Sequence, residues 1–423
     1  MLESFGRLCR KELDTSVIPF WLKHSPDREY GGYLNALERD GTPFDTTKYM
    51  WMQGRAVWMF SRLYNQWARK EAYLDAARVG ADFIRRKGRD RKGRIYFSVT
   101  REGRPVRYQR KPYGAVFVML GLLEYGRAAN DAAFIDEARR LFWRIVRWIE
   151  KPHLIGKLPV SAPSRLSILG DEMCLMLMAM ELLAVADCAP VRAVLAKAVN
   201  NTLLHYDAKR RILVEHMALD GRDLMSTPEG RLVSPGHSIE LAWFLLHALE
   251  HLGGEVDRAR VRDTALKAVE GTLEFGWDSK YGGLFHFMDI LGKPTLVLEY
   301  FMKVWWPHTE ALYALVLASI ETGDRTFLRW LRRVREYTWR HFPDPKYGEW
   351  FGYLDRQGNV THTSKGTSYK GFFHVPRFLM MSAQRIERQR PCARGNSPLS
   401  PRPALRSLGE GGERVRVREK AGC

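Results

Sequence analysis

Three histidines stand beside prolines at points where helices are expected to begin. His237 lies in SPGHSIELAW, His308 in WWPHTEAL and His374 in KGFFHVPRF, and each is within two residues of a proline. Proline favours the first turn of a helix, and the partial positive charge of a helix N-terminus disfavours an imidazolium. We therefore expect neutral rings near pH 7, which is the form that a general base needs.

Two other uses of these histidines stay open. A single histidine at a helix start often serves local hydrogen bonding only, but three in equivalent places are harder to explain in that way. A metal site is the second alternative, because His237 and Glu240 share one helix face. Zinc sites use three or four ligands with recognisable spacing, and the His-Glu-x-x-His pattern is absent. We expect no metal.

Carboxylates, an arginine and a tryptophan lie close to these histidines in the sequence. Glu240 and Glu310 could be the two carboxyl groups of a glycoside hydrolase, although their place beside histidines favours supporting roles. Arg55, in YMWMQGRAVW, interrupts an apolar stretch. A buried charge is costly unless it is paired or faces water, so Arg55 is a candidate for holding a substrate oxygen. Trp306 could stack on the C–H face of a sugar ring.

The loops that carry these residues repeat along the chain. The clearest copies are DREYGGY at 27–33, DSKYGGL at 278–284 and DPKYGEW at 344–350. Weaker copies are DRKGRIY at 90–96 and DAKRRIL at 207–213, and the region of Gly156 stands where a sixth copy is due. Self-similarity at a fixed period indicates a repeat architecture, here of six units of about sixty residues.

Each unit is expected to hold two helices of different character. Segment 112–130 is apolar almost all round, whereas 132–150 has a single apolar stripe. A helix that is apolar all round is buried, and one with a stripe lies at the surface. The twelve expected helices are 1–24, 48–67, 71–87, 112–130, 132–150, 166–187, 190–206, 236–253, 257–274, 303–322, 325–341 and 369–388.

This alternation predicts an all-α fold, an (α/α)6 barrel of six inner and six outer helices spanning residues 1–388. If the inner helices run parallel, their positive ends gather at one mouth, which would favour an anionic ligand or intermediate. Residues 389–423 are rich in Pro, Gly and Arg and lack an apolar period. We predict that they form a disordered basic tail.

Bulk composition narrows the classes of function. The net charge is +19, but no nucleic-acid-binding motif is present, so we expect no nucleic-acid partner. No apolar run is long enough to span a bilayer, and charged residues interrupt the N-terminus where a signal peptide would be apolar. The five cysteines are odd in number and contain no Cys-x-x-Cys pair. We expect a cytoplasmic protein with free thiols and no membrane association.

Five segments taken together resemble the N-acylglucosamine 2-epimerase family. They are YMWMQGRAVWM, SPGHSIELAWFLL, MKVWWPHTEAL, DPKYGEWFGYL and KGFFHVPR, spread in order over residues 1 to about 388. The resemblance implies an (α/α)6 barrel, usually a homodimer, that interconverts N-acetylglucosamine and N-acetylmannosamine. No cofactor is required for the chemistry, although ATP is an activator in parts of the family.

The resemblance also assigns roles to residues. It implies that His237 and His374 are the paired acid and base, and that Arg55 binds the substrate. Glu240, His308 and Glu310 would be the polar residues around the sugar, to which the stacking candidate Trp306 is added as a substrate-binding residue. Phe372 stands where some animal relatives have a cysteine, which excludes a catalytic thiol there, and no glycine-rich phosphate loop is visible.

The mechanism that we expect is proton transfer at C2 of the open-chain sugar. One histidine removes the proton to give an enolate, and the other protonates the opposite face. Alternatives are an epimerase or aldose–ketose isomerase of neutral sugars such as mannose or cellobiose, and an (α/α)6 glycoside hydrolase. The non-enzymatic alternative is a protein-binding scaffold, for which both histidines would be dispensable.

Overall fold

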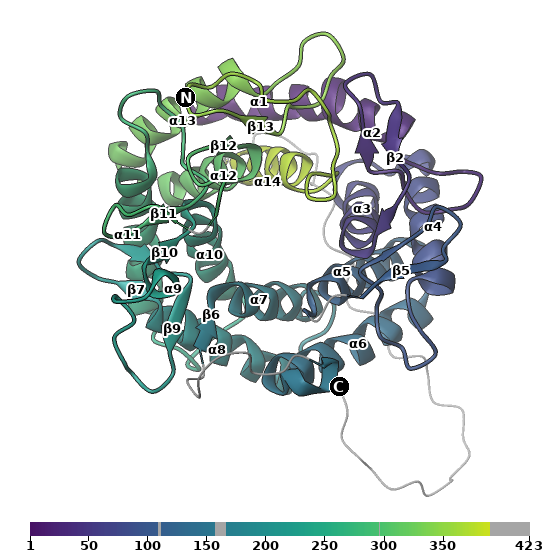
Figure 1. Ribbon diagram of the computed structural model, residues 1–423, viewed down its shortest axis with the longest axis horizontal. Coiled ribbons are helices and arrows are strands. Elements are labelled where there is room, and N and C mark those ends of the chain that lie inside the picture. The colour runs from purple at the N-terminus through teal and green to yellow at the C-terminus, as the bar shows by residue number, and fades with distance from the viewer. Residues whose placement is uncertain (109–110, 157–165, 296, 390–423) are drawn as a thin grey trace, which may run out of the picture.

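The computed structural model describes residues 1–389 except 109–110, 157–165 and 296, and its helices form two concentric rings (Figure 1). The inner ring contains α3 (Met50–Arg62), α5 (Tyr113–Ala129), α7 (Leu169–Leu183), α10 (Pro235–Ala248), α12 (Trp305–Thr322) and α14 (His374–Arg388). The outer ring contains α1 (Leu2–Glu12) continuing into η1 (Leu13–Val17) and α2 (Ile18–His24), then α4 (Glu71–Lys87), α6 (Ala132–Glu150), α8 (Ala189–Leu204), α11 (Arg258–Gly276) and α13 (Arg325–His341).

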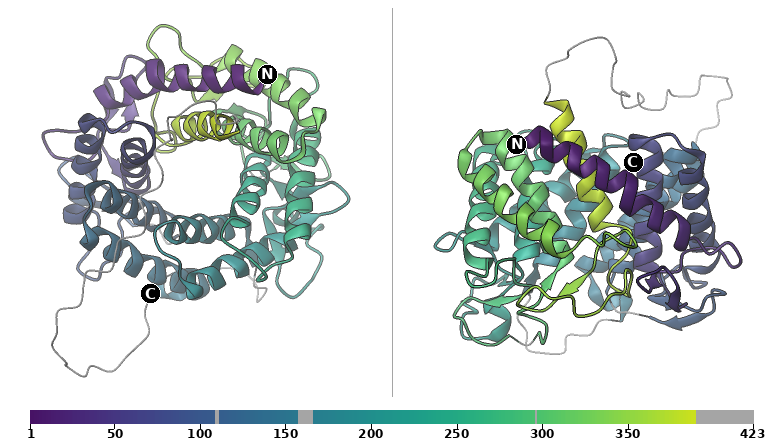
Figure 2. Two further views of the ribbon diagram at one scale, coloured as in Figure 1. Left: turned by 180° about the vertical axis from the view of Figure 1, so that it is seen from behind. Right: turned by 90° about the horizontal axis from the view of Figure 1, so that it is seen from above.

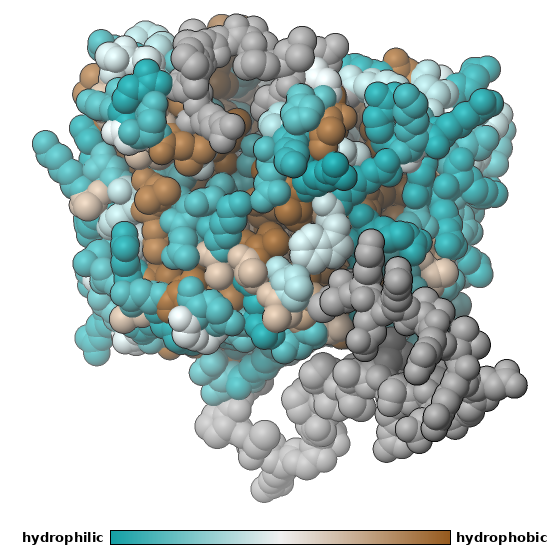
Figure 3. Space-filling model, turned by 90° about the horizontal axis from the view of Figure 1, so that it is seen from below, coloured by the Kyte–Doolittle hydropathy of each residue, from teal (hydrophilic) through white to brown (hydrophobic). Residues whose placement is uncertain are grey.

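Burial separates the two rings as the sequence predicts. Helix α12 is buried on every face from Trp305 to Ser319 with few exceptions, whereas α13 buries only a stripe that includes Phe327, Leu331 and Val334. Such a stripe packs against the core and leaves charged residues outside. The side of the barrel in Figure 3 is accordingly mainly hydrophilic, with apolar side chains between the charged ones. These findings confirm the prediction of an (α/α)6 barrel.

Short turns join each inner helix to the outer helix that follows. Helix α5 ends at Asn130 and α12 at Gly323, both with left-handed backbone (φ 55° and 67°). The next residue caps the outer helix: Asp131 accepts from the Ala133 amide and Asp324 from the Thr326 amide. A left-handed C-terminal residue followed by an Asp N-cap reverses the chain within two residues.

Long loops join each outer helix to the next inner helix, and they pair with one another at a single mouth. The strands in these loops are β1 (Ala36–Leu37), β2 (Pro43–Asp45), β3 (Lys48–Tyr49), β4 (Ser98–Val99), β5 (Pro105–Arg107), β6 (Leu166–Ile168), β7 (Tyr206–Asp207), β8 (Ile212–Leu213), β9 (His216–Ala218), β10 (Leu232–Val233), β11 (Met288–Asp289), β12 (Lys303–Val304) and β13 (Tyr353–Leu354). Antiparallel pairs β3–β4, β6–β9, β10–β11 and β12–β13 link neighbouring loops, and a bridge from Leu37 to Gly366 joins the last unit to the first.

The side view in Figure 2 shows the strands at one end of the barrel and the C-terminal end of α14 at the other. The inner helices therefore begin at the mouth that carries the long loops, which we call the loop mouth. We call the opposite end the turn mouth. The positive ends of the inner helices gather at the loop mouth.

The aspartate of the repeated sequence phrase forms a buried ion cluster that links neighbouring units. Asp27 contacts Lys48 of its own unit at 2.8 Å and Arg101 of the next unit at 3.0 Å. The same cluster recurs as Asp278 with Lys303 and Arg356, and as Asp344 with Lys365 and Arg39. In the last cluster the arginine comes from the first unit, so this contact closes the ring.

A few local features differ from the expected elements. Helix α14 begins at His374 and not at 369, and short wider turns, η1 and η2 (Leu63–Trp67), extend two helices. The loops also contain η3 (Pro152–Ile155) and the short helix α9 (Pro228–Arg231). Within the described residues no helix is long and apolar enough to cross a membrane. The predicted tail lies, apart from Gln389, outside the described residues.

Candidate active site at the loop mouth

His237 stands in the first turn of α10 and is held by a carboxylate. Pro235 opens the helix, and the Ser234 hydroxyl caps it by accepting from the His237 amide. The ring Nδ1 lies 2.9 Å from Oε1 of Glu215, which belongs to the loop before α10 and is buried. The His237 side chain keeps 30% of its surface exposed, so the ring can meet a ligand.

His374 is the first residue of α14 and has the same kind of partner. Its Nδ1 lies 2.8 Å from Oε1 of Glu310 on α12. The other oxygen of Glu310 accepts a hydrogen bond from the Trp243 indole at 3.0 Å. The His374 side chain is 10% exposed, against 1% for Glu310, so Glu310 lies behind the ring.

A buried arginine joins the two carboxylates that the sequence singled out. Nη2 of Arg377 contacts Oε1 of Glu310 at 2.8 Å and Oε1 of Glu240. Glu240, Glu310 and His374 have potential metal-ligand atoms within 4.8 Å of one another. The Arg377 guanidinium already pairs with both carboxylates, and a divalent cation in the same place would be repelled by its charge.

The two histidines differ in the direction of their pKa shifts. Burial lowers the pKa of His374 well below 6.5, and the positive charges of Arg377 and Arg55 lower it further. Burial also opposes the charged form of His237, but the Glu215 carboxylate outweighs it and raises the pKa of that ring. At His237 the carboxylate contact thus opposes the effect that the helix dipole alone was expected to have on the ring.

Trp306 contacts the rings of both histidines. Its ring centroid is 5.0 Å from that of His237 and 5.9 Å from that of His374. Gly236 makes this position available, since a Cβ there would lie 2.3 Å from the Trp306 ring. The structure therefore brings the predicted stacking residue to both predicted acid–base residues.

Arg55 lies on α3, another of the inner helices, and contributes a buried cation near these residues. Its guanidinium lies over the rings of Phe117 and Phe373, 4.0 and 4.9 Å from their centroids. Burial lowers the pKa of Arg55 to about 9, although Glu240 opposes this shift. Its buried Nε has no hydrogen-bond partner among the described residues. Such a cation is suited to bind an oxygen that carries negative charge.

His308 does not join this group. The ring is fully buried; Nδ1 donates to the Val304 carbonyl at 2.8 Å, and Nε2 accepts from the Leu284 amide at 3.0 Å. Burial lowers its pKa to about 3. With both nitrogens bound to backbone, His308 joins α12 to the repeated loop, and the expectation that it binds substrate is not supported by its position.

Sequence reasoning missed three residues of this region. Glu215 follows the apolar run Ile-Leu-Val, and a carboxylate at the end of a buried strand was the available signal. Arg377 lies in the quoted segment KGFFHVPR, but nothing local shows that it faces inward. His286 lies in the loop before α12, 6.1 Å from the Trp306 ring, and burial lowers its pKa to about 4.

The hydrogen bonds fix how the two rings can act. A carboxylate at Nδ1 keeps the proton on that nitrogen in the neutral ring and leaves Nε2 as the base. Among the described residues no hydrogen bond to either Nε2 is found. The site therefore offers two Nε2 atoms, on rings that both contact Trp306, with Arg55 as a nearby cation. This arrangement suits proton abstraction and return on a small polar substrate.

Known proteins share both the sequence and this architecture. The family described as N-acylglucosamine 2-epimerase (GlcNAc 2-epimerase) matches residues 31–376. The N-acylglucosamine 2-epimerase of Bos taurus is 40% identical over 386 residues, which cover 89% of this chain and 90% of that protein. The human protein of the same name is 36% identical over 91% of each chain.

Solved structures agree on the fold. A cellobiose 2-epimerase from Bacillus thermoamylovorans B4167 superposes with a TM-score of 0.78 at 22% identity, over 90% of this chain and 99% of that one. A D-mannose isomerase gives a TM-score of 0.74 at 17% identity, over 90% and 97% of the two chains. Since the family match covers most of the chain and the relatives match along nearly their whole length, this chain belongs to the N-acylglucosamine 2-epimerase family.

Proposed function

We propose that this protein is an isomerase, an N-acylglucosamine 2-epimerase that interconverts N-acetylglucosamine and N-acetylmannosamine. The observation that carries the proposal is the pair His237 and His374, each bound through Nδ1 to a carboxylate and each in contact with Trp306. Inversion at one carbon requires a base on one face and an acid on the other. The named relatives support the choice of sugar.

The reaction proceeds through the open-chain aldehyde. Nε2 of one histidine takes the C2 proton, and the electron pair of the broken C–H bond moves onto the carbonyl oxygen to give an enolate. The protonated Nε2 of the other histidine then delivers a proton to the opposite face of C2. No net charge is gained or lost by substrate and enzyme together, and no redox cofactor is required.

The opposite pKa shifts suit one direction of transfer. His374 is the ring held neutral and His237 is the ring that retains a proton more readily. The resting enzyme is therefore prepared for abstraction by His374 and donation by His237. Arg55 and the positive helix ends at the loop mouth stabilise the enolate oxygen.

A two-carboxylate hydrolase is less well supported. Retaining and inverting glycosidases place their carboxyl groups on opposite sides of the glycosidic bond. Here Glu240 and Glu310 contact the same nitrogen of Arg377, which suits positioning. Similarity to solved (α/α)6 hydrolases is limited to the fold, at 10% identity for one family 76 α-mannanase.

The proposal is tested by proton NMR of the protein with N-acetylmannosamine in heavy water. We expect N-acetylglucosamine carrying deuterium at C2, because the returning proton comes from a histidine that exchanges with solvent. Parallel tubes with mannose, glucose and cellobiose test neutral sugars. Turnover of only a neutral sugar would reassign the substrate, and no reaction with any sugar would overturn the enzymatic proposal.

Three further expectations belong to the same proposal. The protein is proposed to be a homodimer in the cytoplasm that serves amino sugar metabolism. The chemistry uses no cofactor, and ATP is proposed only as an activator. Light scattering tests the first point, and the NMR experiment with and without ATP tests the last.

A further inference from the structure

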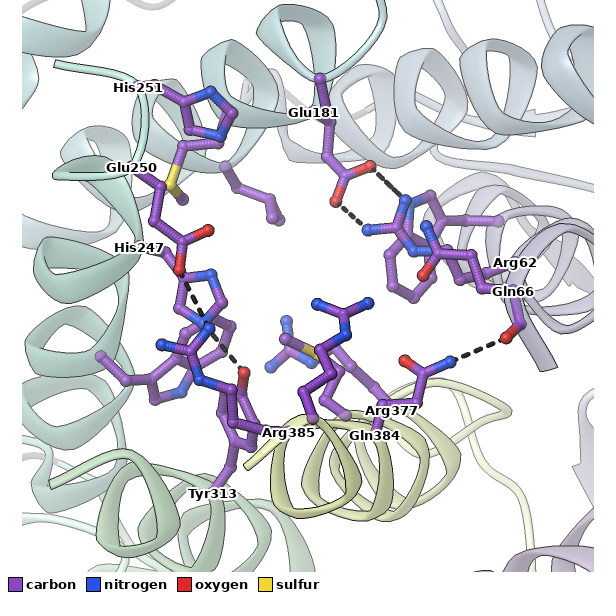
Figure 4. A pocket seen from close by; sticks show the side chains of 17 residues that line it. Arg62, Gln66, Glu181, His247, Glu250, His251, Tyr313, Arg377, Gln384 and Arg385 are labelled. Carbon is purple, nitrogen blue, oxygen red and sulfur yellow. Dashed lines mark hydrogen bonds and ion pairs between the residues drawn. The ribbon is translucent and has the colours of Figure 1, made fainter. Parts of the chain in front are cut away.

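A second cavity opens at the turn mouth, away from the histidines of the active site. It has a volume of about 390 Å³ and is enclosed by inner helices α3, α7, α10, α12 and α14. Figure 4 shows Gln384 and Arg385 of α14 around this space, opposite Glu181 of α7. Cavities of this size can hold small organic molecules.

The wall of this cavity carries more positive than negative charge. Four arginines line it, Arg62, Arg377, Arg385 and Arg388, against two acids, Glu181 and Glu250. Histidines also line it, but burial lowers the pKa of His247 to about 4 and also lowers that of His251, so both rings are neutral at pH 7.

The arginines differ in how closely they are already paired with carboxylates. Arg62 is held by Glu181 and by Glu124 behind the wall. Arg385 has only longer contacts, 3.3 Å to Glu250 and 3.6 Å to Glu321. For Arg388, which is exposed at the rim, no ion pair is found among the described residues.

The spare hydrogen-bonding capacity of the buried wall consists of donors. Nη1 of Arg377 and Nε of Arg385 are buried N–H groups without a partner, and no buried acceptor of the described lining residues lacks one. The Arg377 side chain is only 3% exposed, so an unmet donor there is costly. An anion satisfies these groups with acceptors alone, whereas each hydroxyl of a neutral sugar also brings a donor that needs a partner of its own.

Aromatic side chains complete the wall. Trp58, Trp243 and Tyr313 line the cavity, and such surfaces pack against the ring of an organic ligand. We propose that the cavity at the turn mouth is a second binding site for a small organic anion, a phosphate or carboxylate attached to a ring. Arg385 and Arg388 face the one anionic group from the rim side, and Arg377 faces it from the inner side.

Arg377 connects this site to the active site. Its Nη2 binds Glu240 and Glu310, and Glu310 holds His374, while the same side chain lines the turn-mouth cavity. An anion beside Arg377 offsets the positive charge that lowers the pKa of His374. Occupancy of the cavity is therefore expected to shift the pH dependence of turnover. This second part rests on the proposed function.

Calorimetric titration tests the site without any need for turnover. The probes are phenyl phosphate and benzoate, which separate phosphate from carboxylate on the same ring. We expect one of them to bind, and Arg385→Gln and Arg388→Gln to weaken binding by about tenfold each, because a charge-assisted hydrogen bond is lost. The matched control is Arg332→Gln on outer helix α13, which should bind as the unaltered protein does.

The outcomes separate the two proposals. No binding of either probe at millimolar concentration, or equal affinity in all three variants, would overturn the second site. Binding without any sugar turnover would leave the site standing and count against the epimerase. Binding with turnover but an unchanged pH profile would overturn the coupling through Arg377.

Discussion

The two active-site histidines are each bound by a carboxylate, but their pKa values shift in opposite directions, up for His237 and down for His374. Each ring begins an inner helix and is bound at Nδ1 by a carboxylate, at 2.9 and 2.8 Å. Glu215 touches no arginine among its described contacts, and its charge acts on His237. Glu310 is shared with Arg377, so its charge is largely neutralised before it can favour an imidazolium.

The difference shows that a carboxylate partner alone does not set the pKa of a histidine. What matters is the sum of charges around the pair, since a cation on the same carboxylate cancels its effect. An enzyme that inverts a carbon needs one ring protonated and the other neutral. Deeper burial, together with the charges of Arg377 and Arg55, separates the pKa values of the two rings in this way, although both are bound by a carboxylate at the same nitrogen.

The largest effect is expected from removing either ring. His237→Asn and His374→Asn should each lower epimerisation by about 10²–10⁴-fold, the usual contribution of a general acid or base. Each variant retains one base, so in heavy water each should exchange the C2 proton of a different epimer without converting it. Deuterium uptake followed by NMR from both epimers checks this.

A matched histidine variant controls that experiment. His153 is exposed in the short helix η3, and His153→Asn should convert both sugars at the rate of the unaltered protein. Full turnover by both active-site variants would remove the histidines from the mechanism. Exchange of the same epimer by both would show that the rings do not face opposite sides of C2.

Replacing Arg377, which contacts both Glu240 and Glu310, should bring the pKa values of the two histidines closer together. Arg377→Gln removes a positive charge that lowers the pKa of His374, so this pKa rises and the corresponding limb of the pH–rate profile moves to higher pH. The variant also leaves Glu240 and Glu310 buried without a cation, at a cost of about 3–5 kcal/mol in unfolding free energy. Thermal unfolding and pH–rate profiles measure the two effects.

Arg377→Lys is the control, because it keeps the charge and loses only the geometry of the guanidinium. It should leave the limb of His374 close to its original pH even if the protein is less stable. A shift as large as that of Arg377→Gln would show that geometry, and not charge, controls His374.

The surroundings of His237 and of His374 also differed in how much of them could be predicted from the sequence. The repeat phrases and the alternation of buried and striped helices were enough for the barrel, because periodicity reports directly on burial. Proline and histidine at helix starts identified both rings. The partners were predictable only where they shared a segment with a recognised motif, as Glu310 does with WWPH.

Glu215 and Arg377 show where such reasoning stops. Glu215 reaches His237 from the bend between β8 and β9, 22 residues earlier in the chain, and its role depends on how that loop folds over α10. His308 shows the reverse case, since it also stands within two residues of a proline at a helix start. As the fourth residue of α12, its ring binds backbone groups of the loop before that helix.

Neutralising Glu215 should lower the pKa of His237, whereas replacing Arg377 should raise that of His374. Glu215→Gln removes the charge that raises the pKa of His237, so this pKa falls. When His237 donates, the alkaline limb of kcat/KM moves to lower pH, by about one unit for loss of an adjacent opposite charge. Glu137→Gln is the control: Glu137 lies on outer helix α6 and pairs with Arg85 and Arg89, which belong to neither histidine's surroundings. An unmoved limb in Glu215→Gln would exclude Glu215 as the positioning residue.

The smallest effect should come from moving Trp306, which contacts both histidines, without changing any charge. A methyl group in Gly236→Ala would lie 2.3 Å from the Trp306 ring, so the indole must shift between the two imidazoles. We expect KM to rise by about threefold to tenfold, or about 1 kcal/mol, with both limbs of the pH profile in place because no charge changes. Gly114→Ala is the matched control: Gly114 is likewise the second residue of an inner helix, but its added Cβ would meet nothing closer than 3.8 Å. If Gly236→Ala moved only one limb, Trp306 would belong to one histidine, and the symmetry of the site about this ring would be lost.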